Sequence, residues 1–195
     1  MNLLRNLLAL IGLLAVVLVV YSGFRIYPDY QRFQQLDPQA GKVYGEMFEK
    51  LLETGNSAEA TVWKVQVEEG LTPKDVEEVV RFVANEHNIK NVGELPLYKQ
   101  VEAMSGKPYR FATIYMFCNA LTAARMMDYS DAFSAYLPCR VSLIEDKQGR
   151  LWIYSLNMDM MIHGGKTLPP DLKEEAMQVK EIILDIMNRG ARGEF

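Results

Sequence analysis

The sequence predicts a small α+β domain, with helices packed on a mostly antiparallel sheet, preceded by one N-terminal transmembrane helix. Three observations support this prediction: an uncharged apolar tract near the N-terminus, short alternating segments rich in β-branched residues, and helix-start signals between those segments. With 195 residues, 49% of them hydrophobic, the chain has room for one ordinary domain and a short appendage.

The transmembrane helix is predicted from the first two dozen residues. No charged residue occurs between Asn6 and Phe24, and Leu7–Val20 consists of Leu, Val, Ile and Ala apart from Gly12. About 19 residues at 1.5 Å per residue give roughly 28 Å of helix, close to the hydrocarbon thickness of a bilayer. We therefore expect residues 1–24 to form a signal anchor. A cleaved signal peptide is the alternative.

The charges that flank the apolar tract predict its orientation. Only Arg5 precedes the tract, whereas Arg25 and Arg32 follow it. A short cationic segment before an apolar stretch is typical of an export signal. We therefore expect a single-pass protein of the inner (cytoplasmic) membrane, with its C-terminal domain on the extracytoplasmic, periplasmic side.

Residues 25–57 are predicted to form a stalk and a linker helix. Pro28 and Pro38 bracket the polar stalk, which argues against one continuous helix there. Apolar residues at helical spacing predict a helix from about Gln39 to Glu53. The α+β domain is expected to occupy residues 58–195.

The first half of this domain contains one clear strand and one clear helix. Thr61–Val67 alternates and is rich in β-branched residues, which favours a strand. Thr72 is a suitable N-cap with Pro73 at the first helical position, so a helix is expected from there to about His87. Leu97–Met104 is expected to form a short helix.

The second half of the domain shows a strand, a helix, a hairpin and a final helix. Asn119 is expected to cap the helix that follows the strand Phe111–Cys118. Gly190 is expected to end the last helix. The turn of the hairpin is predicted at Asp146–Gly149. The predicted strands are Phe111–Cys118, Arg140–Ile144 and Leu151–Leu156, and the predicted helices are Ala120–Met127 and a segment that begins at Pro169–Pro170.

One part of the chain resembles a known family. Cys118-Asn119 closes a strand, Leu137-Pro138-Cys139 opens the next, and an acidic hairpin and a terminal helix follow. This arrangement resembles the domain-of-unknown-function 302 (DUF302) family over about residues 60 to 190, here as a membrane-anchored member. Ala120 stands where a proline often follows the "CN" pair in that family. The resemblance implies an α+β fold and no particular activity.

The two cysteines are the first candidate site. Cys118 and Cys139 both lie at strand ends, which a strand–helix–strand unit can bring together. They could act as a redox-active or metal-binding pair, and the helix that starts after Cys118 is expected to lower the pKa of its thiol. A structural disulfide and two simply buried thiols are the alternatives.

A methionine-rich segment is the second candidate site. If this segment is extended, Met158 and Met160 share one face, with His163 close by. Thioether and imidazole groups suit a soft metal such as copper(I), or an axial position on a non-covalent haem. The alternative is core filling or an apolar pocket. Met126 and Met127 are interpreted as ordinary core filling.

These features predict a membrane-anchored extracytoplasmic domain that binds a small ligand or a partner protein. The pocket is expected near Cys118, Asn119, Cys139 and the Met158–His163 segment. A thiol-based oxidoreductase or sulfur-transfer component that uses the two cysteines is one alternative, and an accessory subunit of a membrane complex is another. The sequence contains no familiar catalytic motif, and a net charge of −4 argues against nucleic-acid binding.

Overall fold

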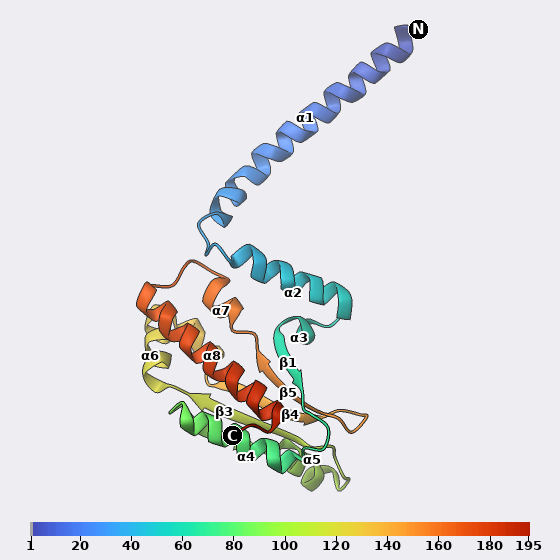
Figure 1. Ribbon diagram of the computed structural model, residues 1–195. Coiled ribbons are helices and arrows are strands. Elements are labelled where there is room, and N and C mark those ends of the chain that lie inside the picture. The colour runs from blue at the N-terminus through green and yellow to red at the C-terminus, as the bar shows by residue number, and fades with distance from the viewer. Residues whose placement is uncertain (1) are drawn as a thin grey trace.

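The computed structural model describes residues 2–195 and shows an α+β domain with a long N-terminal helix attached (Figure 1). The sheet has five strands in the order β1-β5-β4-β3-β2, and every neighbouring pair is antiparallel. The predicted fold class is therefore confirmed. The strands are β1 (Val62–Gln66), β2 (Lys90–Leu95), β3 (Ala112–Cys118), β4 (Cys139–Glu145) and β5 (Leu151–Leu156).

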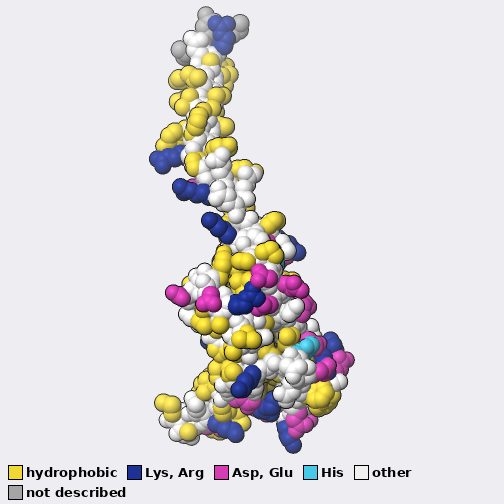
Figure 2. Space-filling model, turned by 90° about the vertical axis from the view of Figure 1, so that its left-hand side faces the viewer, with side chains coloured by type: hydrophobic (Ala, Val, Ile, Leu, Met, Phe, Trp, Pro, Cys, Tyr) yellow, Lys and Arg dark blue, Asp and Glu magenta, His cyan; other side chains and the backbone are white. Residues whose placement is uncertain are grey.

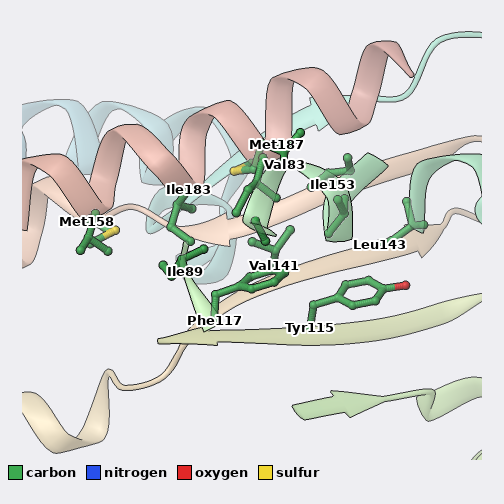
Figure 3. Close-up of a cluster of buried hydrophobic side chains, with 14 of the residues drawn as sticks. Val83, Ile89, Tyr115, Phe117, Val141, Leu143, Ile153, Met158, Ile183 and Met187 are labelled. Carbon is green, nitrogen blue, oxygen red and sulfur yellow. The ribbon is translucent and has the colours of Figure 1, made fainter. Parts of the chain in front are cut away.

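Two helices, α4 (Pro73–Glu86) and α8 (Pro170–Arg192), pack against each other and form the second layer over the sheet (Figure 1). Their buried side chains join those of the strands in one core, where Ile183 and Met187 of α8 lie over the sheet (Figure 3). The remaining helical segments of the domain are α3 (Ser57–Ala60), α5 (Leu97–Ser105), α6 (Ala120–Tyr129), the 3-10 helix η1 (Asp131–Ala135) and α7 (Asp159–His163).

The predicted start of α4 is confirmed in detail. The Thr72 hydroxyl accepts a hydrogen bond from the backbone N–H of Asp75, and the Asp75 carboxylate accepts one from the backbone N–H of Thr72 at 2.8 Å. This reciprocal capping box satisfies two N–H groups that the first helical turn leaves unpaired. Pro73 follows the N-cap, where its missing N–H costs nothing.

The N-terminal helix α1 (Asn2–Phe33) is longer than the sequence predicts, because it continues through Pro28. The expected break at Pro28 is therefore wrong. Pro28 has no N–H to donate to the carbonyl one turn earlier, so α1 continues with that one backbone hydrogen bond missing. Side-chain pairs one turn apart flank the proline, such as Tyr30 with Gln34 at 2.9 Å.

Among the described residues, α1 is the one helix long and apolar enough to cross a membrane. None of its apolar stretch is buried against the domain, and Val19 is 70% exposed. Figure 2 shows hydrophobic side chains along the length of this helix, with basic side chains toward its two ends.

The helix α2 (Ala40–Thr54) follows α1 after a short connection and packs in part on the domain. Ala40 and Val43 are buried, whereas Phe48 and Leu52 on the apolar stripe remain exposed. Asp37, in the connection itself, is also buried. The predicted stalk and linker therefore include residues that contact the α+β domain.

Two elements of the domain differ from the sequence-based prediction. Strand β2 was not predicted, because it is an edge strand with a register shift between Asn91 and Gly93 and little alternation of apolar residues. Gly190 does not end α8. The helix continues to Arg192, and Gly193, with a left-handed backbone conformation, caps it. A side chain at Gly190 would meet Val80 at 3.0 Å, so glycine there permits close packing of α8 on α4.

Candidate functional site: a sulfur-lined cavity at the ends of β3 and β4

The pairing of β3 with β4 brings the two cysteines together. Phe117 lies opposite Cys139 in the antiparallel register, so Cys118 is one residue beyond the paired position. Both cysteines are half-buried and free. The sequence-based expectation that these two strand ends meet is consistent with this register.

Asn119 fixes how the chain leaves β3. Its side-chain oxygen accepts hydrogen bonds from the backbone N–H groups of Leu121 and Thr122, at 3.2 and 3.3 Å. Asn119 is thus the N-cap of α6, as predicted. The cap orients α6 so that Ala123 and Met126 are buried beside the ends of the two strands.

A small cavity of about 40 Å³ lies between β3, β4, α6, α7 and α8. Its lining is apolar, and the two cysteines, Asn119 and Met158 all contribute to it. Four of the six residues predicted to bind a ligand, Cys118, Asn119, Cys139 and Met158, therefore line the same cavity. Met161 and Ile162, from the predicted Met158–His163 segment, also line the cavity. Four further lining residues lie outside the predicted site: Met126, Phe133, Tyr136 and Leu137.

The environment of the thiols opposes their ionisation. Burial raises the pKa of the Cys118 thiol above its ordinary value. Burial, together with the neighbouring Cys118, raises the pKa of Cys139 to about 11. The expected lowering of the Cys118 pKa is therefore wrong, because burial favours the neutral thiol over the thiolate.

The methionine-rich segment is helical, so the extended conformation considered for it is wrong. It forms the short helix α7, preceded by Met158. In a helix, residues two apart point in different directions, so Met158 and Met160 do not share a face. Met158 and Met161 line the cavity, whereas Met160 lines a separate hollow beside Tyr44.

His163 is buried on the side of α7 that faces the connection between α1 and α2. Its Nδ1 lies 3.2 Å from Oδ1 of Asp37, and the side chain of His163 is 4% exposed. The Lys173 ammonium of α8 donates to Oδ2 of the same carboxylate at 2.6 Å. His163 therefore belongs to a polar junction that holds the N-terminal connection, and it does not line the cavity.

Asp37 is the centre of this junction and was missed by the sequence analysis. Its carboxylate accepts a hydrogen bond from the backbone N–H of Gln39 at 3.0 Å, and its own N–H donates to the Gly165 carbonyl at 2.8 Å. Burial alone would raise the pKa of Asp37, but the bonds from Lys173 and Gln39 hold it at about 2. In the sequence, Asp37-Pro38 indicates only a turn.

The residues proposed for a haem or copper ion do not fit either group. Met158, Met160 and His163 lie on different sides of α7, and the His163 ring is paired with Asp37. Pockets for molecules of cofactor size are typically about 300–1,000 Å³, far larger than this cavity of about 40 Å³. In the described part of the chain, no three His, Cys, Asp or Glu side chains could together hold a metal ion.

Ion pairs and hydrogen bonds keep α6 and α7 in place around the cavity. Arg125 of α6 pairs with Asp171 and Glu175 of α8. On the other wall, Lys180 of α8 donates to Asp159 of α7 at 2.6 Å. The Tyr44 hydroxyl of α2 donates to the carbonyl of Gly164, just after α7, at 2.7 Å. The cavity walls are thus fixed by polar contacts outside the cavity.

The sequence profile described as "Domain of unknown function DUF302" matches residues 63–190, which include the cavity. The chain belongs to the DUF302 family. The fold of its DUF302 domain is similar to the crystal structure of an uncharacterized conserved DUF302 protein from Bacillus stearothermophilus, with a TM-score of 0.55 and 17% identity. That likeness covers 68% of this chain and 98% of the other, and at this identity it shows the fold alone. No curated protein matches the chain.

The Asp37 junction predicts a stability loss at low pH. Because the pKa of Asp37 falls from 3.8 to about 2 on folding, the ionised carboxylate stabilises the folded state by about 2 kcal/mol. This contribution is complete above about pH 4 and is lost as the pH falls toward 2. Asp37→Asn should therefore be less stable than the wild type at pH 7, and the difference should shrink between pH 4 and pH 2.

The measurement is denaturant unfolding of the full chain in detergent at several pH values, followed by tryptophan fluorescence. Asp29→Asn is the matched control, because Asp29 is 76% exposed in its pair with Arg32 and should change stability by less than about 1 kcal/mol. Equal stability of Asp37→Asn and the wild type at pH 7 would contradict the role given to this carboxylate.

Proposed function

We propose that this DUF302 protein is a membrane-anchored binding domain that takes a small ligand in the cavity between β3, β4, α6 and α7. The observation that carries the proposal is the position of the cavity, at the ends of two interior strands and beside the start of α6. Binding sites are commonly apolar hollows with a few polar groups at such ends. The volume of about 40 Å³ restricts the occupant to a very small molecule or an ion.

The proposed anchor is α1, which extends away from the domain (Figure 1). The apolar side chains of this exposed helix would be unfavourable in water but favourable in lipid. The helix also pairs its own backbone polar groups, as a segment in lipid must. The extracytoplasmic side is supported by the sequence around Arg5, where a short cationic segment precedes the apolar tract. We place the anchor in the cytoplasmic membrane on the same argument.

A thiol-based oxidoreductase or sulfur-transfer activity is the second candidate function. Its support is that Cys118 and Cys139 line one cavity from neighbouring strands. The raised pKa values of both thiols argue against it, since the thiolate is the reactive form. A reversible Cys118–Cys139 bridge with a measurable reduction potential would favour this activity over binding.

The topology is testable by protease protection with a tag at the C-terminus. We expect protease added to intact spheroplasts to remove the tag, because the domain lies outside the cytoplasm. A cytoplasmic marker protein should survive the same treatment. A tag that is degraded only after lysis, or a tagged chain that remains soluble after membranes are sedimented, would refute the proposed placement.

Xenon tests whether the cavity accepts an occupant, because dry apolar cavities bind this atom. In the full chain labelled at methionine methyl groups, xenon pressure should shift the NMR signals of Met126, Met158 and Met161, which line the cavity. Exposed Met104 and Met127 should not respond. Ala123→Val, which adds volume to the lining, should weaken the shifts; equal responses from all methionines would count against a binding cavity.

A further inference from the structure

The lining of the cavity contains a concentration of sulfur that composition does not explain. Cys and Met account for 13 of the 195 residues but for five of the fifteen residues that line the cavity. The five come from four segments that the fold brings together, and Figure 3 shows Met158 at one end of the core cluster. They are Cys118, Met126, Cys139, Met158 and Met161.

The other polar groups of the lining do not suit a hard cation. The Asn119 oxygen is already used to cap α6, and Thr122 and Tyr136 add only neutral hydroxyl groups. Of the described residues, those that line the cavity include no Asp, Glu or His. Calcium and magnesium require several oxygen ligands, whereas thiolate and thioether sulfur select soft ions such as copper(I). The donor set therefore favours a soft cation.

The size and polarity of the cavity also suit a monovalent ion. A volume of about 40 Å³ accommodates an ion stripped of water but not an organic cofactor. Copper(I) that binds one cysteine thiolate and neutral thioethers releases one thiol proton: Cu⁺ + RSH gives RS–Cu + H⁺. The product has no net charge, which lowers the cost of placing it among apolar side chains. The half-buried Cys118 provides access from solvent.

We propose that the cavity binds one copper(I) ion through sulfur, with Cys118 or Cys139 as the thiolate ligand and with Met126, Met158 and Met161 as the source of thioether ligands. This inference rests on the proposed binding function of the same cavity and names its ligand class. It replaces the set Met158, Met160 and His163, which the fold separates.

The test is anaerobic competition between the full chain in detergent and a chromophoric copper(I) chelator. We expect one copper(I) per chain, with X-ray absorption showing sulfur-only coordination. Cys118→Ser combined with Cys139→Ser should weaken binding by more than about tenfold, because even outer-shell changes at metal sites have effects of this size. Met161→Leu, which conserves volume, should weaken binding without unfolding the domain.

Two neighbouring methionines provide matched controls. Met160→Leu changes the residue beside Met161 on α7, and Met127→Leu changes the residue beside Met126 on α6, yet neither lines the cavity. Both should bind copper(I) as the wild type does. Equal effects of Met160→Leu and Met161→Leu, or binding that survives loss of both cysteines, would overturn the assignment.

The xenon experiment separates failure of this inference from failure of the proposed function. Xenon shifts at Met126, Met158 and Met161 without copper(I) binding would refute the metal site and leave an apolar binding cavity. Absence of both responses would refute the cavity as a binding site. Thiol quantification before each titration ensures that oxidation of the cysteines does not imitate a loss of affinity.

Discussion

The pairing of β3 with β4 is the constraint on which the candidate site depends. Tyr115 and Phe117 are fully buried and lie opposite Val141 and Cys139. A shift of one residue would turn these side chains away from the core, so burial of the core fixes the register. That register places Cys139 beside Cys118, although a helix and a 3-10 turn separate them in the chain. The register of β3 against β4 therefore determines both the packing of the core and the position of the two cysteines in the cavity.

Helix α7 connects the cavity with the N-terminal segment. Met158 and Met161 line the cavity, and on the other side His163 meets the buried carboxylate of Asp37. The Tyr44 hydroxyl adds a second contact between α2 and the end of α7. A wall of the cavity and the attachment point of α1 are thus parts of one packed unit. If a ligand in the cavity displaced α7, the displacement would reach the attachment point of α1. A change in the orientation of α1 would reach the cavity by the same route.

Features that depend on neighbours in the chain, such as helix starts, can be predicted from the sequence. Features that depend on contacts between distant residues cannot. The capping box at Thr72 and Asp75 and the cap at Asn119 involve neighbours in the chain, so the starts of α4 and α6 were predictable. Strand β2 depends on its pairing with β3, and the burial of Asp37 depends on Lys173 and His163. Likewise, the cysteines are predictable from their strand ends, but Met126 enters the cavity only through the packing of α6.

The central claim is that Cys118 and Cys139, remote in sequence, share one cavity as neighbouring free thiols. Arsenite tests it most directly, because trivalent arsenic forms stable bonds only when two thiols can reach it at once. We predict one arsenic per chain by mass spectrometry of the native protein, with loss of binding in both Cys118→Ser and Cys139→Ser. Retention of arsenic by either single-cysteine variant, or no uptake by the reduced wild type, would contradict the account.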